Sequence, residues 1–207
     1  MERVLDIYKR PYDDRFPVVC YDEMPRQLLA EVREIQPMQQ GRCQRVDYEY
    51  RRMGTCNVLL ASEPLRGWRM VEVTATKTAV DWALFTEKIA SAYPEAEKII
   101  LVEDNLNTHK PASWYEVFPP EKARGLMNKF ELVYTPKHGS WLNMAEIELN
   151  VVSSQCLKRR IASIEEMQKV VMAWKRDRNE NSKTINWQFT TEDARGKLHR
   201  LYPSFQT

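Results

Sequence analysis

The sequence has little of what usually cross-links a chain or anchors it in a membrane. Its four cysteines are widely spaced and form no CxxC pair, so neither a zinc-binding pattern nor a disulfide framework is indicated. No apolar run approaches the roughly 20 residues that cross a bilayer, and no basic start followed by an apolar segment marks a signal peptide. We therefore expect reduced thiols, no membrane partner and a cytoplasmic location.

A strong net charge is also missing. Lys and Arg number 31, Asp and Glu number 29, and the formal net charge is +2. An excess this small predicts no strong overall attraction to nucleic acid, so local basic clusters would have to provide any DNA contact. Hydrophobic residues make up 43% of the 207 residues, which suits one domain with an ordinary core. No internal repeat or low-complexity segment is present.

What the sequence does contain is two short apolar runs that end in acids. The run 98–102 leads to Asp104, and the run 17–21 leads to Asp22 and Glu23. Such runs are typical of buried strands, and open α/β sheets bind ligands at the carboxyl ends of their strands. Because side chains alternate along a strand, only one of Asp22 and Glu23 can share a site with Asp104. A turn-forming role for Asp104 is the alternative.

A third acid comes from the amphipathic helix expected over residues 141–157. Asn143, Glu146 and Asn150 share one face, and Glu148 lies roughly opposite, where we expect it to be exposed. A carboxylate within a largely apolar helix is costly unless it is paired or binds a metal, which makes Glu146 a candidate ligand. Three carboxylates suit two Mg²⁺ or Mn²⁺ ions, and two such ions about 4 Å apart can promote phosphodiester chemistry.

The remaining patterns predict an α/β fold. The order is three strands, helix, strand, helix, strand and further helices, which gives a five-stranded mixed sheet flanked by helices, with three antiparallel strands followed by parallel ones. Irregular structure is expected for an N-terminal arm at 1–15 and a polar C-terminal tail at 179–207, and a long loop or short hairpin for 25–45. The expected strands are 17–22, 48–61, 68–74, 98–104 and 130–136, and the expected helices are 78–93, 111–130 in two pieces, 141–157 and 164–178.

Three motifs resemble the catalytic domain of DDE transposases, in the bacterial insertion-sequence branch related to the mariner superfamily. The Trp-Leu-Asn-x-x-Glu sequence that opens a helix is the most specific of them. The resemblance covers roughly residues 17–160 and implies an RNase H-like fold with a metal-bound triad of Asp22, Asp104 and Glu146. The three motifs are Val18–Glu23, Val102–Asn105 with His109, and Thr135-Pro136 followed by Ser140–Glu146.

The activity implied by this resemblance is metal-dependent DNA cleavage by water and strand transfer by a 3′-hydroxyl. Its implied partners are transposon ends, target DNA and a second copy of the chain. The interval from Asp104 to Glu146 is longer than is usual in the family, and we expect the extra residues around 116–124. Family members carry helix-turn-helix modules before this domain, and we expect residues 1–207 to form a single catalytic domain without one.

Several other residues are candidates by the same resemblance. Asn105, His109 and Asn143 would support the active site, although a turn or cap role suits His109 equally well. Basic clusters contact phosphates, but they are also common on solvated surfaces. The candidates for DNA contact are Lys137, His138, Lys158, Arg159 and Arg160, together with Arg42, Arg45, Arg51 and Arg52.

Two other functions remain open at this point. Another RNase H-like nuclease, such as a resolvase or ribonuclease, would prefer DNA junctions or RNA–DNA hybrids to linear duplex. A catalytically inactive, transposase-derived protein would bind DNA or dimerise without cutting.

Overall fold

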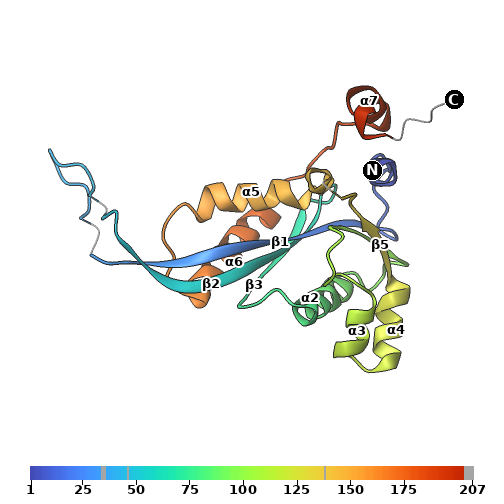
Figure 1. Cartoon of the computed structure of the whole chain (residues 1–207), viewed down its shortest axis with the longest axis horizontal. Helices are drawn as coiled ribbons and strands as arrows, with labels where there is room; N and C mark the ends of the chain where they lie inside the picture. Colours follow the sequence, from blue (N-terminus) through green and yellow to red (C-terminus); the bar gives the residue numbers. More distant parts are fainter. Residues whose placement is uncertain (34–35, 46, 138, 203–207) are drawn as a thin grey trace.

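The apolar runs of the sequence meet in one five-stranded sheet. The computed structural model describes residues 1–33, 36–45, 47–137 and 139–202. The strand order is β3-β2-β1-β4-β5, with antiparallel pairing among the first three strands in sequence and parallel pairing of β4 with β1 and β5. The predicted meander followed by parallel strands is therefore confirmed (Figure 1). The strands are β1 (Val18–Glu31), β2 (Tyr50–Glu63), β3 (Trp68–Thr74), β4 (Ile99–Glu103) and β5 (Phe130–Tyr134).

Helices cover both faces of this sheet. The α2, α3 and α4 helices lie on one side, and α5 and α6 lie on the other (Figure 1). The break between α3 and α4 falls at Pro119-Pro120, as the sequence predicts, because proline suits a first helical turn but not a helix interior. The helices are α2 (Ala79–Ala92), α3 (Ala112–Val117), α4 (Pro120–Lys129), α5 (Ala145–Cys156) and α6 (Ile164–Glu180), and the 3₁₀ turn η1 (Ser140–Leu142) precedes α5.

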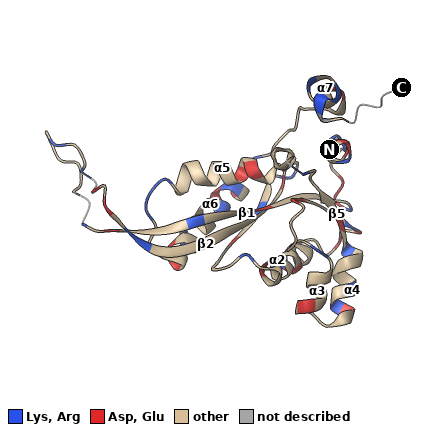
Figure 2. Ribbon diagram, in the orientation of Figure 1, with Lys and Arg blue, Asp and Glu red and all other residues tan. Residues whose placement is uncertain are grey.

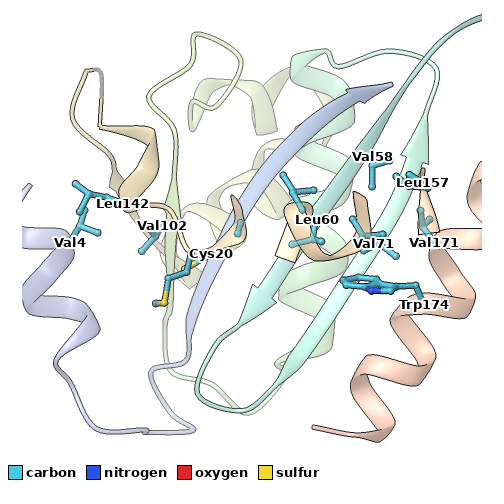
Figure 3. Packing of buried hydrophobic residues seen from close by; sticks show 14 of the residues in the cluster. Val4, Cys20, Val58, Leu60, Val71, Val102, Leu142, Leu157, Val171 and Trp174 are labelled. Carbon is cyan, nitrogen blue, oxygen red and sulfur yellow. The ribbon is translucent and has the colours of Figure 1, made fainter. Parts of the chain in front are cut away.

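The core has two layers because the strands alternate. Cys20, Leu60 and Val102 pack toward α5 and α6 (Figure 3), whereas Val19 and Leu101 pack toward α2, α3 and α4. Every residue of β4 is buried, since this strand lies between β1 and β5 with both faces covered. The end of β4 is thus a rigid place from which to present a side chain.

Both termini are more ordered than the sequence indicates. The expected irregular arm contains α1 (Glu2–Tyr8), and the expected tail contains α7 (Thr191–Lys197) and the 3₁₀ turn η2 (His199–Leu201). Helix α1 forms because Val4, Leu5 and Ile7 are buried against the core. The two terminal helices lie side by side (Figure 1), joined by ion pairs from Arg195 to Glu2 at 2.7 Å.

The segment 25–45 belongs to a hairpin, which is one of the two predicted alternatives, but the hairpin is longer than expected. Strand β1 continues through Pro25 to Glu31 and pairs with β2 along its length, so the two strands form a long hairpin that projects from the body (Figure 1). Pairing of β1 with β4 covers only Val18–Cys20. Beyond that point β1 has a described strand neighbour on one side only, and an edge strand tolerates proline.

Two expectations about the chain's chemistry can be compared directly. All four cysteines are free in the structure, with Cys20 and Cys56 buried and Cys43 exposed. Within the described residues, no helix combines the length and apolar character needed to cross a membrane.

Candidate active site

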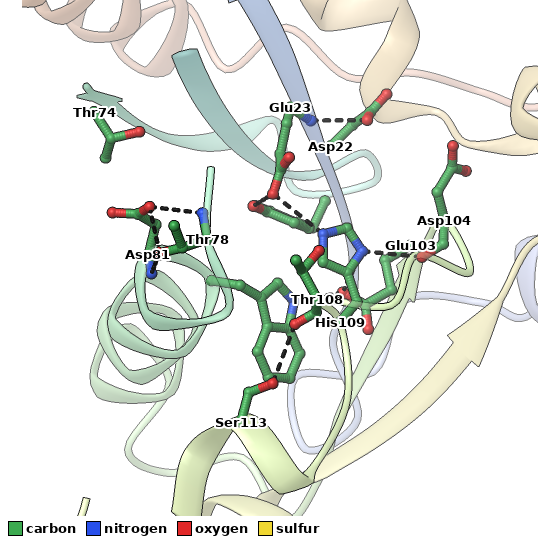
Figure 4. Close-up of polar contacts among 12 residues, drawn as sticks. Asp22, Glu23, Thr74, Thr78, Asp81, Glu103, Asp104, Thr108, His109 and Ser113 are labelled. Carbon is green, nitrogen blue, oxygen red and sulfur yellow. Dashed lines mark hydrogen bonds and ion pairs between the residues drawn. The ribbon is translucent and has the colours of Figure 1, made fainter. Parts of the chain in front are cut away.

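The three predicted acids come from three elements that converge at one end of the sheet. Asp22 lies in β1, Asp104 directly follows β4, and Glu146 lies in the first turn of α5. Because β1 and β4 run parallel with Cys20 opposite Val102, Asp22 and Asp104 occupy matching positions beyond the paired segment. Figure 4 shows their carboxylates on the same side, with Glu23 pointing away from Asp22. The predicted alternation of Asp22 and Glu23 is therefore confirmed.

The charges of these acids act on one another. Burial raises the pKa of Asp22 to about 7, the negative charges of Asp104 and Glu146 add to the rise, and the bond from the Glu23 amide opposes it. That bond is 2.7 Å long. Asp22 is thus a carboxylate in a partly desolvated, negatively charged environment, where a positive ion would be strongly favoured.

The donor set suits a hard divalent cation, since it consists of carboxylate oxygens from rigid elements. One oxygen of Asp22 accepts the Glu23 amide, and one oxygen of Asp104 accepts the Thr135 hydroxyl at 2.7 Å. Each acid therefore presents a second oxygen that makes no hydrogen bond among the described residues. In this conformation, however, no three acidic, His or Cys side chains of the described ranges are grouped closely enough to enclose an ion.

A surface groove runs beside Asp104. It lies over the start of the β4–α3 connection and the β5–η1 connection, so it opens next to the candidate ligands. Lys137 is exposed on its rim, and Asn105 is exposed as well. His138, a further candidate here, lies outside the described residues. The groove is lined by Asp104, Asn105, Leu106, Thr135, Pro136, Lys137 and Ser140.

Asn143 connects two of the acid-bearing elements. Its side-chain nitrogen donates a 2.7 Å hydrogen bond to the main-chain carbonyl of Tyr21 in β1. Its side-chain oxygen accepts the Ala145 amide at 3.1 Å at the start of α5. Asn143 is 1% exposed, so both bonds are shielded from water. The residue precedes α5 and is buried, so it does not share the polar helix face predicted with Glu146 and Asn150.

His109 lies behind the sheet rather than at the surface. Its ring stacks on Trp82 with centroids 6.0 Å apart, and only 1% of the residue is exposed. Nδ1 donates to the main-chain carbonyl of Asp104 at 2.9 Å, and Nε2 donates to Glu23 at 3.1 Å (Figure 4). His109 therefore joins β1 to the segment that follows β4, and its burial leaves it no surface for a phosphate.

Two glutamates with buried side chains, Glu23 and Glu103, surround His109, and the sequence did not single out Glu103. Burial raises the pKa of Glu103 to about 8, against the opposing effects of His109 and of the Trp82 indole, which donates to it at 2.8 Å. Burial also acts to raise the pKa of Glu23, but hydrogen bonds from His109 and Tyr21 lower it overall. Burial lowers the pKa of His109, and the two glutamates more than reverse that effect. Strand alternation, which turns Glu23 and Glu103 away from the acids, is the signal that could have found them.

Glu148 is not the exposed glutamate that the helix pattern predicts. It is fully buried, and its Oε1 accepts from Arg69 at 2.6 Å and from Arg178 at 2.8 Å. The prediction was wrong because these partners lie on β3 and α6, which helix periodicity cannot reveal. The cluster holds α5, and with it Glu146, against the sheet.

The basic run 158–160 has mixed surroundings. Lys158 is exposed, whereas Arg159 pairs with Glu166 at 2.9 Å. Arg160 donates to the main-chain carbonyls of Asp47 at 2.8 Å and Glu49 at 2.7 Å. Arg160 thus ties the α5–α6 connection to the segment that leads into β2, with its donors engaged there, and its role as a DNA contact stays a prediction.

Comparison with known families places this site in context. The family described as "DDE superfamily endonuclease" matches residues 17–168, which include all three acids. A search among curated proteins finds no match.

Several solved structures of the Mos1 mariner transposase resemble the chain. A paired-end complex with Mn matches with a TM-score of 0.57 and 16% identity, over 88% of this chain and 54% of that one. A pre-cleavage Mos1 transpososome matches with a TM-score of 0.56 and 15% identity, over 88% and 59%. A Mos1 strand transfer complex matches with a TM-score of 0.56 and 15% identity, over 84% and 51%. The likeness confirms the RNase H-like fold, and the chain spans about half the length of these structures.

Proposed function

Because the chain belongs to the DDE superfamily endonucleases, we propose that it is the catalytic domain of a transposase that cuts DNA and joins the freed 3′-hydroxyl to a target. The Mos1 structures hold transposon ends and strand-transfer products, which supports DNA as the substrate. Their paired-end state also motivates the expectation that two copies act together. We expect the reaction to take place in the cytoplasm.

The proposed ligands are Asp22, Asp104 and Glu146, which would hold two Mg²⁺ or Mn²⁺ ions. The chemistry that two bound ions supply is activation of the attacking oxygen and stabilisation of the leaving oxygen. The protein's own part is to hold three carboxylates on rigid elements at one end of the sheet. Thr135 orients Asp104 through its hydroxyl, and Asn143 ties the strand of Asp22 to the helix of Glu146.

The observation that carries this proposal is the position of the three acids, which β1, β4 and α5 bring to one end of the sheet. Asp104 and Glu146 both raise the pKa of Asp22, although they come from distant parts of the sequence. Like charges gathered in a partly buried place are unfavourable on their own, and they are typical of sites that bind cations or react. Membership of an endonuclease family then favours phosphodiester chemistry over a purely structural role.

The test is a nicking assay on linear duplex DNA with Mg²⁺ or Mn²⁺. We expect wild type to nick and Asp104→Asn to lose nicking, because the substitution removes a negative ligand with little change in volume. The matched control is Glu116→Gln in α3, an exposed acid remote from the three elements, which should nick normally. Full activity of Asp104→Asn, or cutting confined to RNA–DNA hybrids or junctions, would overturn the proposal.

A further inference from the structure

The position of Glu146 depends on the short segment that precedes its helix, residues 142–144. The main-chain carbonyl of Asn143 accepts the Glu146 amide at 3.1 Å. Met144 occupies the N-cap position of α5, and its thioether does not supply the capping oxygen of a Ser or Asp. The first turn of α5 therefore follows the segment 142–144, which other parts of the chain must hold in place.

Tyr8, from the N-terminal helix α1, bonds to both ends of this segment. Its hydroxyl donates to the main-chain carbonyl of Leu142 at 2.8 Å and accepts the Met144 amide at 3.4 Å. The same hydroxyl lies 3.5 Å from the Cys20 thiol, two residues before Asp22 in β1. Because the hydroxyl has one proton, which it gives to Leu142, the thiol donates in that contact. One phenol thus connects α1, the strand of Asp22 and the segment before α5.

The chain that follows α6 packs against the same place. The rings of Trp187 and Tyr8 are in tilted contact, with centroids 5.4 Å apart. The Trp187 indole donates to the main-chain carbonyl of Phe189 at 2.7 Å. The Phe189 ring in turn meets Trp141 of the η1 turn edge-on, with centroids 5.6 Å apart. The C-terminal segment therefore supports both Tyr8 and the turn that leads into residues 142–144.

The two terminal helices also hold each other. The Thr191 hydroxyl of α7 donates to Asp6 of α1 at 2.9 Å, in addition to the pair between Arg195 and Glu2. The charged segments of both helices are marked in Figure 2. The family match covers residues 17–168, so Tyr8 and both terminal helices lie outside it.

We propose that Tyr8 is a positioning residue that holds Glu146 in place relative to Asp22 for metal binding. The hydroxyl fixes the segment 142–144, and the carbonyl of Asn143 within that segment fixes the Glu146 amide. Tyr8 acts through these residues and hydrogen-bonds to neither acid. The inference rests on the proposed function, because it takes Asp22 and Glu146 as metal ligands.

The Tyr8→Phe variant removes the hydroxyl and keeps the ring against Trp187. The carbonyl of Leu142 and the amide of Met144 then lose this partner in a part of the protein with little access to water, which is unfavourable. We expect the segment to shift. A displacement of about 1 Å between positioned groups can lower a rate by about 100-fold, and we expect about tenfold here because Asn143 still holds Tyr21.

The first measurement is single-turnover nicking of a linear duplex as a function of Mn²⁺ concentration. Tyr8→Phe should nick more slowly at saturating Mn²⁺ and should need more Mn²⁺ to reach half of its maximal rate. The second measurement is hydrogen exchange of the metal-free chain, followed by mass spectrometry. Peptides that span 140–147 should exchange faster in Tyr8→Phe than in wild type, whereas peptides from α2 should exchange equally in both.

Two control variants separate positioning from stability. Tyr12→Phe removes a hydroxyl from an exposed tyrosine of the same N-terminal segment, and it should change neither nicking nor exchange. Ile89→Val removes a buried methyl group from α2, across the sheet from α5, and it should lower stability. Below its unfolding temperature, Ile89→Val should nick normally and keep the wild-type Mn²⁺ dependence.

Three results would contradict the inference. The first is normal nicking by Tyr8→Phe at every Mn²⁺ concentration, which would make the hydroxyl a purely structural group. The second is slower nicking with unchanged exchange of residues 140–147. The third is an equal loss of nicking in Ile89→Val, because lower stability alone would then explain the effect.

The same assays separate this inference from the proposed function. If Asp104→Asn is inactive and Tyr8→Phe nicks normally, the proposed function stands and the role of Tyr8 fails. If Asp104→Asn keeps full activity, the assignment of the acids fails, whatever the result for Tyr8→Phe.

Discussion

The side-chain amide of Asn143 donates a 2.7 Å hydrogen bond to the main-chain carbonyl of Tyr21, the residue immediately before Asp22. The other end of the same amide accepts from Ala145, the residue immediately before Glu146. One buried side chain therefore spans the strand and the helix that carry two of the proposed ligands. This arrangement gives Asn143 a positioning role that a simple helix cap would not have.

Replacement of Asn143 with alanine should lower nicking by about 100-fold, since a shift of about 1 Å between positioned groups costs that much. It should also destabilise the fold by about 1–3 kcal/mol, because the Tyr21 carbonyl loses its partner. Single-turnover nicking and urea denaturation measure the two effects. Asn150→Ala, at an exposed position of α5, is the control and should change neither. Normal nicking by a destabilised Asn143→Ala protein would limit the residue to a structural role.

Substitution of Glu148 should lower the stability of the fold, whereas substitution of Glu146, two positions away on α5, should remove nicking. Glu148→Ala leaves Arg69 buried without its carboxylate and should cost about 3–5 kcal/mol of unfolding free energy. Glu146→Gln should change stability by less than about 0.5 kcal/mol and abolish nicking. Chemical denaturation and the nicking assay on both proteins decide the matter. Similar losses of stability in the two variants would contradict the assignment.

The fold was largely predictable because its main elements depend on local patterns. Apolar runs marked β4 and the start of β1, and Pro119-Pro120 marked the break between α3 and α4. Asp22 and Asp104 were visible for the same reason, since each follows an apolar run. Helices α1 and α7 were missed because each has only seven residues and is stabilised by contacts with distant parts of the chain.

The supporting residues could not be predicted from the sequence in the same way. The burial of Glu148 depends on Arg69, and the position of the β1–β2 hairpin depends on Arg160. Both partners are distant in sequence. Periodicity assigns a residue to a face of its own helix, but it does not tell which element covers that face. The continuation of β1 through Pro25 likewise depends on the loss of its β4 neighbour.

Glu63, which is remote from the three proposed ligands, leads to a prediction about the pH dependence of stability. Burial raises its pKa, against the hydrogen bond from Tyr93 at 2.8 Å and the charge of Arg66 at 3.8 Å, and the Tyr12 phenol also lies close enough to interact with it. The folded-state pKa lies above the unfolded value, so the stabilising contribution is complete below the unfolded pKa and is lost as pH rises through the folded pKa.

Glu63→Gln stays neutral and still accepts from Tyr93, so its stability relative to wild type should rise as the pH increases from about 4 through the raised folded-state pKa of Glu63. Urea denaturation across that range measures the difference. The exposed Glu121→Gln should show a constant difference from wild type. A constant difference for Glu63→Gln as well would refute the effect of burial.

Mn²⁺ binding by calorimetry, in the presence of duplex DNA, tests the central claim most directly. Wild type and Asp104→Ala are titrated side by side, with circular dichroism to show that both are folded. The account predicts binding by wild type and its loss in the folded variant, because Asp104 supplies a ligand that Asp22 and Glu146 cannot replace. Equal binding by the two proteins, or none by either, would contradict the assignment of Asp22, Asp104 and Glu146 as a metal site.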